Sequence, residues 1–184
     1  MPEQEPAFET AWAQSMYEFN NYMRAQFAGR WLWIPNAGSW TTTRDTTNEY
    51  TNVDGVMIED FADYSNEKFL YPGDWVTQMD RALSITTLDK ILIAQSYPSA
   101  SGGAFYERQE ILASYLLVKG KLTYLNLAAK GEADPGGLTL QWWPDYEINP
   151  GPPTDPRPAT TTSRSTGMRT GKSLSAAIKT GLFW

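Results

Sequence analysis

The sequence predicts an α/β fold: a partial (β/α)8 TIM-barrel-like domain of about four βα units, with a disordered C-terminal tail. Short apolar runs, each long enough for a buried strand, begin at residues 31, 55, 90 and 122. Segments with apolar residues at helical spacing lie near or between them. Continuously apolar strands are typical of a parallel sheet covered on both faces, and a spacing of roughly 30 residues is typical of repeated strand–helix units. Four units make about half of an eight-stranded barrel, which usually takes about 250 residues.

The chain opens with a predicted amphipathic helix that stops at Gly29. Its large apolar residues recur every three or four positions, so they share one face. We expect that face to be buried and the opposite face to be in water. The face consists of Phe8, Trp12, Met16, Phe19, Met23 and Phe27.

Residues 31–34 are predicted as a short, wholly buried first strand, and residues 55–60 as the second. The stretch 41–52 has no clear period, so we expect a loop there. Pro72-Gly73 then interrupts the chain and offers Asp74 as the N-cap of a second helix. The apolar face of that helix is marked by Trp75, Met79 and Leu83.

A third strand is predicted at 90–94, a third helix at about 106–119 and a fourth strand at 122–126. Gly120 is placed as the stop of the third helix. A doubly wound open sheet is the alternative architecture. No glycine-rich phosphate loop follows any predicted strand, so a nucleotide-binding version of that sheet has little support.

Composition changes after Pro150, where Pro, Gly, Thr, Ser and Arg dominate. Such composition is typical of linkers and disordered segments. We therefore predict a partial barrel domain over 1–152 and a poorly ordered tail over 153–184.

The composition also excludes several kinds of chemistry. The chain has no cysteine and no histidine, which excludes disulfides, thiol nucleophiles, Ser-His-Asp triads and the usual zinc sites. We expect no cofactor and no metal. A formal net charge of −6 argues against nucleic acid as a partner. No apolar run is long enough to span a membrane, and the acidic N-terminus does not resemble a signal peptide. A soluble chain is expected, although an export signal in longer relatives would leave its compartment open.

Polar residues stand where the predicted strands end, which is the active edge of parallel βα folds. Glu59 and Asp60 follow the second strand, Gln95 and Tyr97 the third, and Asn126 the fourth. Carboxylate, amide and hydroxyl groups all bind polyhydroxylated ligands. The competing interpretation is that one carboxylate caps the next segment and the other is simply solvated.

A second candidate region, 141–151, combines aromatic rings for stacking on sugars with carboxylates for acid–base work. The alternative interpretation, to which we give equal weight, is that these aromatic side chains form a plug that closes the rim of the barrel. Trp33 and Tyr124, from predicted strands, are added as sugar-binding candidates. The candidates in 141–151 are Trp142, Trp143, Asp145, Tyr146 and Glu147.

Three stretches resemble the C-terminal half of hypothetical glycosyl hydrolase family fifteen. They are Gly-Val-Met-Ile-Glu-Asp at 55–60, Ala-Ser-Tyr-Leu-Leu-Val-Lys-Gly-Lys-Leu-Thr-Tyr-Leu-Asn at 113–126 after Glu107-Arg108, and Trp-Pro-Asp-Tyr-Glu-Ile-Asn-Pro-Gly at 143–151. The resemblance covers roughly residues 30 to 152. It implies a TIM barrel that hydrolyses glycosidic bonds, with Glu59 or Asp60 at the acidic position after a central strand. The first barrel strands are missing and the pattern stops near Pro152, which favours a fragment.

The leading hypothesis is therefore a glycoside hydrolase that acts on a polysaccharide or oligosaccharide. Glu59 or Asp60 would be the general acid, and Glu147 or Asp145 the base or nucleophile. The first alternative is a carbohydrate-binding remnant without activity. The second is an assembly subunit that self-associates through an open sheet edge. A carbohydrate is the expected partner under the first two hypotheses.

Overall fold

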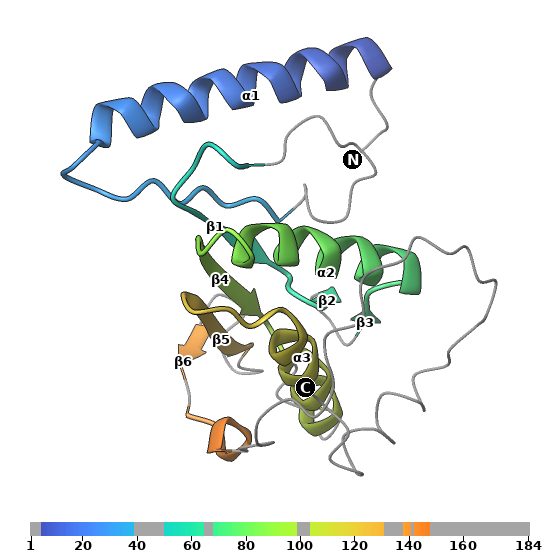
Figure 1. The fold of residues 1–184 in the computed structure, drawn as a ribbon. Helices are drawn as coiled ribbons and strands as arrows, with labels where there is room; N and C mark the ends of the chain where they lie inside the picture. Colours follow the sequence, from blue (N-terminus) through green and yellow to red (C-terminus); the bar gives the residue numbers. More distant parts are fainter. Residues whose placement is uncertain are drawn as a thin grey trace.

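The computed structural model describes residues 5–38, 50–64, 68–98, 104–130, 138–140 and 142–147 (Figure 1). These residues form a mixed α/β fold. The expected tail, 153–184, and nearly all of the expected loop at 41–52 lie outside them. In chain order the elements are α1 (Pro6–Phe27), β1 (Gly55–Glu59), β2 (Asp63–Tyr64), β3 (Lys68–Phe69), α2 (Pro72–Thr86), β4 (Ile91–Ser96), α3 (Ala104–Val118), β5 (Thr123–Lys130), β6 (Leu138–Leu140) and the 3-10 helix η2 (Pro144–Glu147).

The main sheet has the strand order β1-β4-β5-β6. The first three strands are parallel, which confirms the strands predicted near residues 55, 90 and 122. β6 pairs antiparallel with β5, and β2 forms a separate two-stranded ribbon with β3. Neither β6 nor this ribbon was predicted, because such short strands carry no periodicity that a sequence window can detect.

The sheet has one face against the helices. Alternate side chains of each strand point to opposite faces. One set is buried with side chains of α2 and α3 in a single apolar cluster, so both helices cover the same face. Figure 1 shows α2 and α3 beside that sheet. The buried members of this cluster include Val56, Ile58, Met79, Ala82, Ile85, Leu92, Ala94, Ile111 and Val118.

α2 and α3 confirm the predicted helices, with two details of their ends now visible. Asp74 is not the N-cap of α2: Tyr71 takes that place, and Pro72 stands at the first helical position, which its fixed φ favours. Asp74 lies in the first turn, where a carboxylate complements the helix dipole. Gly120 follows the end of α3, and a Cβ there would come within 3.0 Å of Thr86 Cβ. Close packing therefore favours glycine at this position.

α1 confirms the predicted first helix, but the expected burial of its apolar face is wrong. The only buried residues of α1 are Ala13 and Asn20. Phe8, Trp12 and Phe19 are all exposed. Periodicity shows which side chains share a face, but burial also needs another element to cover that face, and no described element covers most of this one.

The buried strand expected at 31–34 is also wrong. Trp31 and Leu32 are exposed, and the segment contributes one isolated parallel bridge, between Asn36 and Met57. The Trp33 amide donates to Asp54 Oδ2 at 2.9 Å, so its hydrogen bond goes to a side chain and not to a sheet ladder. The apolar run therefore lies beside the edge of β1 without extending the sheet.

In the part of the chain that the structure describes, no helix is both long enough and apolar enough to cross a membrane.

Candidate active site at the carboxyl edge of the sheet

Three of the predicted site residues form a row across the parallel strands. Glu59 at the end of β1 is in register with Gln95 of β4, and Gln95 is in register with Asn126 of β5. Side chains at paired positions of adjacent strands point to the same face, and this row alternates with the buried residues that face the helices. The row therefore projects from the sheet face opposite α2 and α3.

Glu59 is held by hydrogen bonds to both of its carboxylate oxygens. The Tyr97 hydroxyl donates to Oε1 at 2.6 Å, and Asn36 Nδ2 donates to Oε2 at 2.8 Å. These bonds favour the charged form, so they lower the pKa of Glu59 in spite of a smaller opposing effect of burial. Glu59 is consequently an ionised carboxylate at neutral pH.

Tyr97 follows β4 directly. Its burial and its bond to Glu59 raise the pKa of the hydroxyl to about 12, so the phenol stays protonated as a donor. Asn36 was not among the predicted site residues. It comes from the segment after residue 34, and the Gly38 amide donates to its Oδ1 at 3.1 Å, which leaves the side-chain NH2 directed to Glu59.

The row continues toward β5 through a second hydrogen bond. Asn126 Nδ2 donates to Gln95 Oε1 at 2.9 Å. The next residue, Leu127, donates its amide to the Tyr146 hydroxyl at 3.2 Å, which ties η2 to the middle of β5. The Tyr146 hydroxyl therefore lies next to the residue that follows Asn126.

The backbone that follows Glu59 is strained. Asp60 has φ 57° and Ala62 has φ 62°, in the left-handed region that non-glycine residues rarely adopt. Gln78 of α2 stabilises this turn, because its Oε1 accepts the Ala62 amide at 2.7 Å. Strain of this kind persists where surrounding structure enforces it, and it concentrates at functional sites.

The turn after Glu59 leads into β2, whose first residue is an acid that the sequence analysis did not single out. Asp63 is only 1% exposed, and neither of its carboxylate oxygens has a hydrogen-bond partner among the described residues. Burial raises its pKa to about 7, with further repulsion from Glu107, Glu110 and Asp60. Burial also raises the pKa of Glu110. Glu59 at the end of β1 and Asp63 at the start of β2 thus have pKa values displaced in opposite directions.

η2 forms a cluster with the start of α3. Asp145 is buried and accepts a 2.6 Å charged hydrogen bond from Arg108 Nε. The Arg108 guanidinium also lies 4.1 Å from the centre of the Trp143 ring. An aspartate and an arginine paired in this way hold η2 against α3, so Asp145 has an evident structural role.

The remaining η2 residues are more accessible. Trp142 is 69% exposed, lies edge-on to Tyr146 at 5.1 Å between ring centres, and donates from Nε1 to Glu147 Oε1 at a long 3.5 Å. Glu147 is itself exposed. These two side chains are free to meet a ligand at the surface.

The two remaining aromatic candidates are placed differently. Trp33 donates from Nε1 to Asn20 Oδ1 at 3.0 Å and packs edge-on against Phe19, so it joins α1 to the chain that follows it. Tyr124 is exposed near the start of β5, two residues before Asn126 and on the same face of the sheet. It therefore lies next to the Asn126 end of the row, on the side toward the amino ends of the strands.

The described part of the chain contains no group of three or more Asp or Glu side chains arranged to hold a metal ion.

A family model, hypothetical glycosyl hydrolase family 15, matches residues 3–166. The match extends on both sides beyond the residues from which the resemblance was noted. No curated protein and no solved structure matches the chain.

Proposed function

The chain belongs to hypothetical glycosyl hydrolase family 15, and from this premise we propose that it hydrolyses glycosidic bonds of a poly- or oligosaccharide at the carboxyl edge of its sheet. The observation that carries the proposal is Glu59, an ionised carboxylate at the end of the parallel strand β1, in one row with two amide side chains. Glycoside hydrolysis uses a pair of carboxyl groups, one of which must be charged.

We propose the barrel as the architecture that contains this site. From β1 to β4 to β5 each connection moves one strand further in the same direction, while α2 and α3 stay on one face. A doubly wound sheet reverses direction and places helices on both faces. In a barrel, the row of Glu59, Gln95 and Asn126 would line the inside near the mouth, where such enzymes bind substrate.

Within this mechanism Glu59 acts as the base or nucleophile, because its lowered pKa makes it a poor proton donor. Asp60, in the strained turn directly after β1, supplies the proton. Gln95 and Asn126 hold sugar hydroxyls. Glu147 and Trp142 extend the binding surface from η2.

The experiment is release of reducing sugar from a panel of polysaccharides by the full chain and by Glu59→Gln. We expect the amide variant to lose roughly 10²–10⁴-fold in rate while it stays folded. Glu9→Gln, an exposed carboxylate on α1, is the matched control and should act like the original chain. Asp60→Asn tests Asp60 as the proton donor and should also lose rate. Equal rates for Glu59→Gln and the control would refute the role of Glu59.

Carbohydrate binding without hydrolysis is the second candidate, favoured by the exposed indole of Trp142 beside Glu147. In that case the original chain releases no sugar from any polymer. A Glu59→Gln/Asp60→Asn variant would then bind the same polymer as the original chain, while Trp142→Ala would bind it less well.

A further inference from the structure

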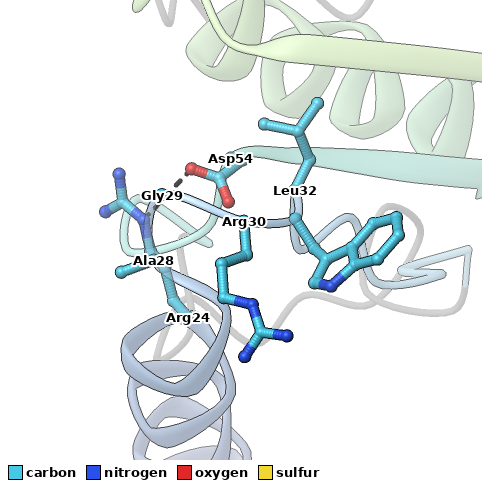
Figure 2. Close-up of a pocket in the computed structure, with 7 residues that line it drawn as sticks. Arg24, Ala28, Gly29, Arg30, Leu32 and Asp54 are labelled. Atoms are coloured by element: carbon cyan, nitrogen blue, oxygen red, sulfur yellow. Dashed lines mark hydrogen bonds and ion pairs between the residues drawn. The ribbon is translucent and has the colours of Figure 1, made fainter.

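A pocket of about 740 Å³ lies at the amino end of β1, at the opposite end of that strand from Glu59. Its volume is within the range of roughly 300–1,000 Å³ that is typical of ligand pockets. Figure 2 shows its walls, which come from the end of α1, from the segment that follows it and from the residue before β1. The lining residues are Arg24, Ala28, Gly29, Arg30, Trp31, Leu32 and Asp54.

The walls of this pocket are held in place by local bonds. Gly29 has φ 74°, a conformation that favours glycine, and it turns the chain back after α1. The amides of Arg30 and Trp31 both donate to Phe27 O, at 2.9 and 3.0 Å, and close the helix end. Asp54 accepts from Arg24 at 3.2 Å on one oxygen and from the Trp33 amide at 2.9 Å on the other. The walls of the pocket are therefore fixed by bonds within the protein itself.

The chemistry of the lining is cationic and aromatic. Two arginines face one aspartate, a positive balance on a chain whose formal net charge is −6. Arg24 is engaged with Asp54, whereas Arg30 makes no ion pair with a described residue, and Figure 2 shows its side chain directed away from that pair. Trp31 and Leu32 are 69% and 64% exposed. The Arg30 guanidinium, unpaired within the described residues, and the exposed indole of Trp31 line the same pocket. Together they are suited to a flat, apolar ring face that carries an anionic group.

We propose that this pocket binds a uronic acid unit of an acidic polysaccharide, with Arg30 paired to the sugar carboxylate and Trp31 stacked on the ring. The identity of the ligand as a sugar rests on the proposed function. β1 separates the pocket from Glu59 by roughly 15 Å, at about 3.3 Å per residue. The pocket thus retains the polymer at a distance from the bond that is cut.

The test is binding of the full chain to polygalacturonate and to neutral galactan, measured by isothermal titration calorimetry at low and at moderate salt. We expect binding to polygalacturonate that weakens with salt, and weaker binding to galactan. Arg30→Ala and Trp31→Ala should each raise the Kd for polygalacturonate about tenfold. Arg30→Lys keeps the charge but loses the planar fork of the guanidinium. Its Kd should lie between that of the original chain and that of Arg30→Ala.

Matched controls come from exposed residues outside the pocket: Trp12→Ala, at the other end of α1, and Lys121→Ala, in the turn before β5. Both should bind like the original chain. Unchanged binding in folded Arg30→Ala and Trp31→Ala variants, or equal affinity for galactan, overturns the proposal. Because binding is measured directly, a chain that hydrolyses nothing but binds polygalacturonate through Arg30 and Trp31 refutes the hydrolase and retains the pocket.

Discussion

The Tyr97 hydroxyl donates a 2.6 Å hydrogen bond to Glu59 Oε1 and ties the carboxyl end of β4 to that of β1. The bond joins a phenol that stays protonated to a carboxylate that stays charged. Each therefore favours the other's protonation state. The charge of Glu59 thus depends on a residue contributed by the neighbouring strand.

Tyr97→Phe should move the acidic limb of the pH–rate profile to higher pH. Losing the hydroxyl removes a bond that stabilises the charged carboxylate, so the pKa of Glu59 rises toward its usual range. We expect a shift of up to about one pH unit, and a loss of up to about tenfold in kcat/KM at pH values well below the ordinary pKa of 4.5. Initial rates measured from pH 3 to 8 check both.

Tyr106→Phe is the control for that profile, because Tyr106 is an exposed tyrosine of α3 whose ring contacts Phe105. It should leave the profile unchanged. An acidic limb that stays in place in Tyr97→Phe would mean that Glu59 does not set it.

The row of site residues could be predicted because each member comes directly after, or at the end of, an apolar run. Glu59, Gln95 and Asn126 needed only the rule that parallel strands end at a common edge. Asn36 could not be found in this way. It reaches Glu59 across 23 positions of the chain, from a segment whose place beside β1 depends on hydrogen bonds to Asp54 and Met57.

Asp63 and α1 are two further cases in which the local sequence pattern did not predict burial. The sequence around Asp63 reads as a polar loop, and its burial depends on α3, whose Glu107 and Glu110 raise its pKa. The sequence of α1 reads as a half-buried helix, yet Phe8 and Trp12 are exposed. Local pattern determines the helix and the loop, whereas burial is set by elements distant in the chain.

Asp63→Asn should stabilise the protein above neutral pH. The folded-state pKa of about 7 exceeds the ordinary value of 3.8, so the folded state binds this proton more tightly than the unfolded state does. The stability that Asp63 contributes is fully present below about pH 4 and is lost as pH rises through about 7. The amide imitates the protonated form at every pH.

We therefore expect Asp63→Asn to exceed the original chain by on the order of 2–4 kcal/mol in free energy of unfolding at pH 8.5, with no difference near pH 4. Urea unfolding followed by circular dichroism at both values measures this. Asp80→Asn, an exposed carboxylate on α2, should show no such trend. A destabilised Asp63→Asn at pH 8.5 would argue that the charged carboxylate has a partner in the folded protein.

Asp145→Asn should reduce stability. Asp145 and Arg108 are both largely buried, and removing one charge leaves the other without its partner in a dry environment, at a cost of about 3 kcal/mol. Arg24→Ala, which breaks the more exposed pair with Asp54, should cost less than about 1 kcal/mol. Urea unfolding of both variants gives the comparison. Lost turnover with unchanged stability in Asp145→Asn would instead assign Asp145 to the chemistry.

Gly55→Ala should be among the most damaging single changes in the sheet. A Cβ at Gly55 would lie 2.3 Å from Ile91 O and 2.5 Å from Ile91 Cβ, closer than any real contact, so β1 must move away from β4. Overpacking of this kind costs about 3 kcal/mol. Gly73→Ala in the first turn of α2 meets nothing within 4 Å and should be neutral or stabilising by less than about 1 kcal/mol.

Turnover gives a second measurement of the effect of Gly55→Ala. Glu59 reaches Tyr97 because β1 and β4 are in contact along their whole paired length, from Gly55 with Ile91 to Glu59 with Gln95. A displaced β1 should therefore lower turnover in the fraction of Gly55→Ala that remains folded, while Gly73→Ala retains it. A stable, fully active Gly55→Ala would show that the two strands can separate without disturbing the site, and that Glu59 is positioned by the loop after β1 and not by the sheet.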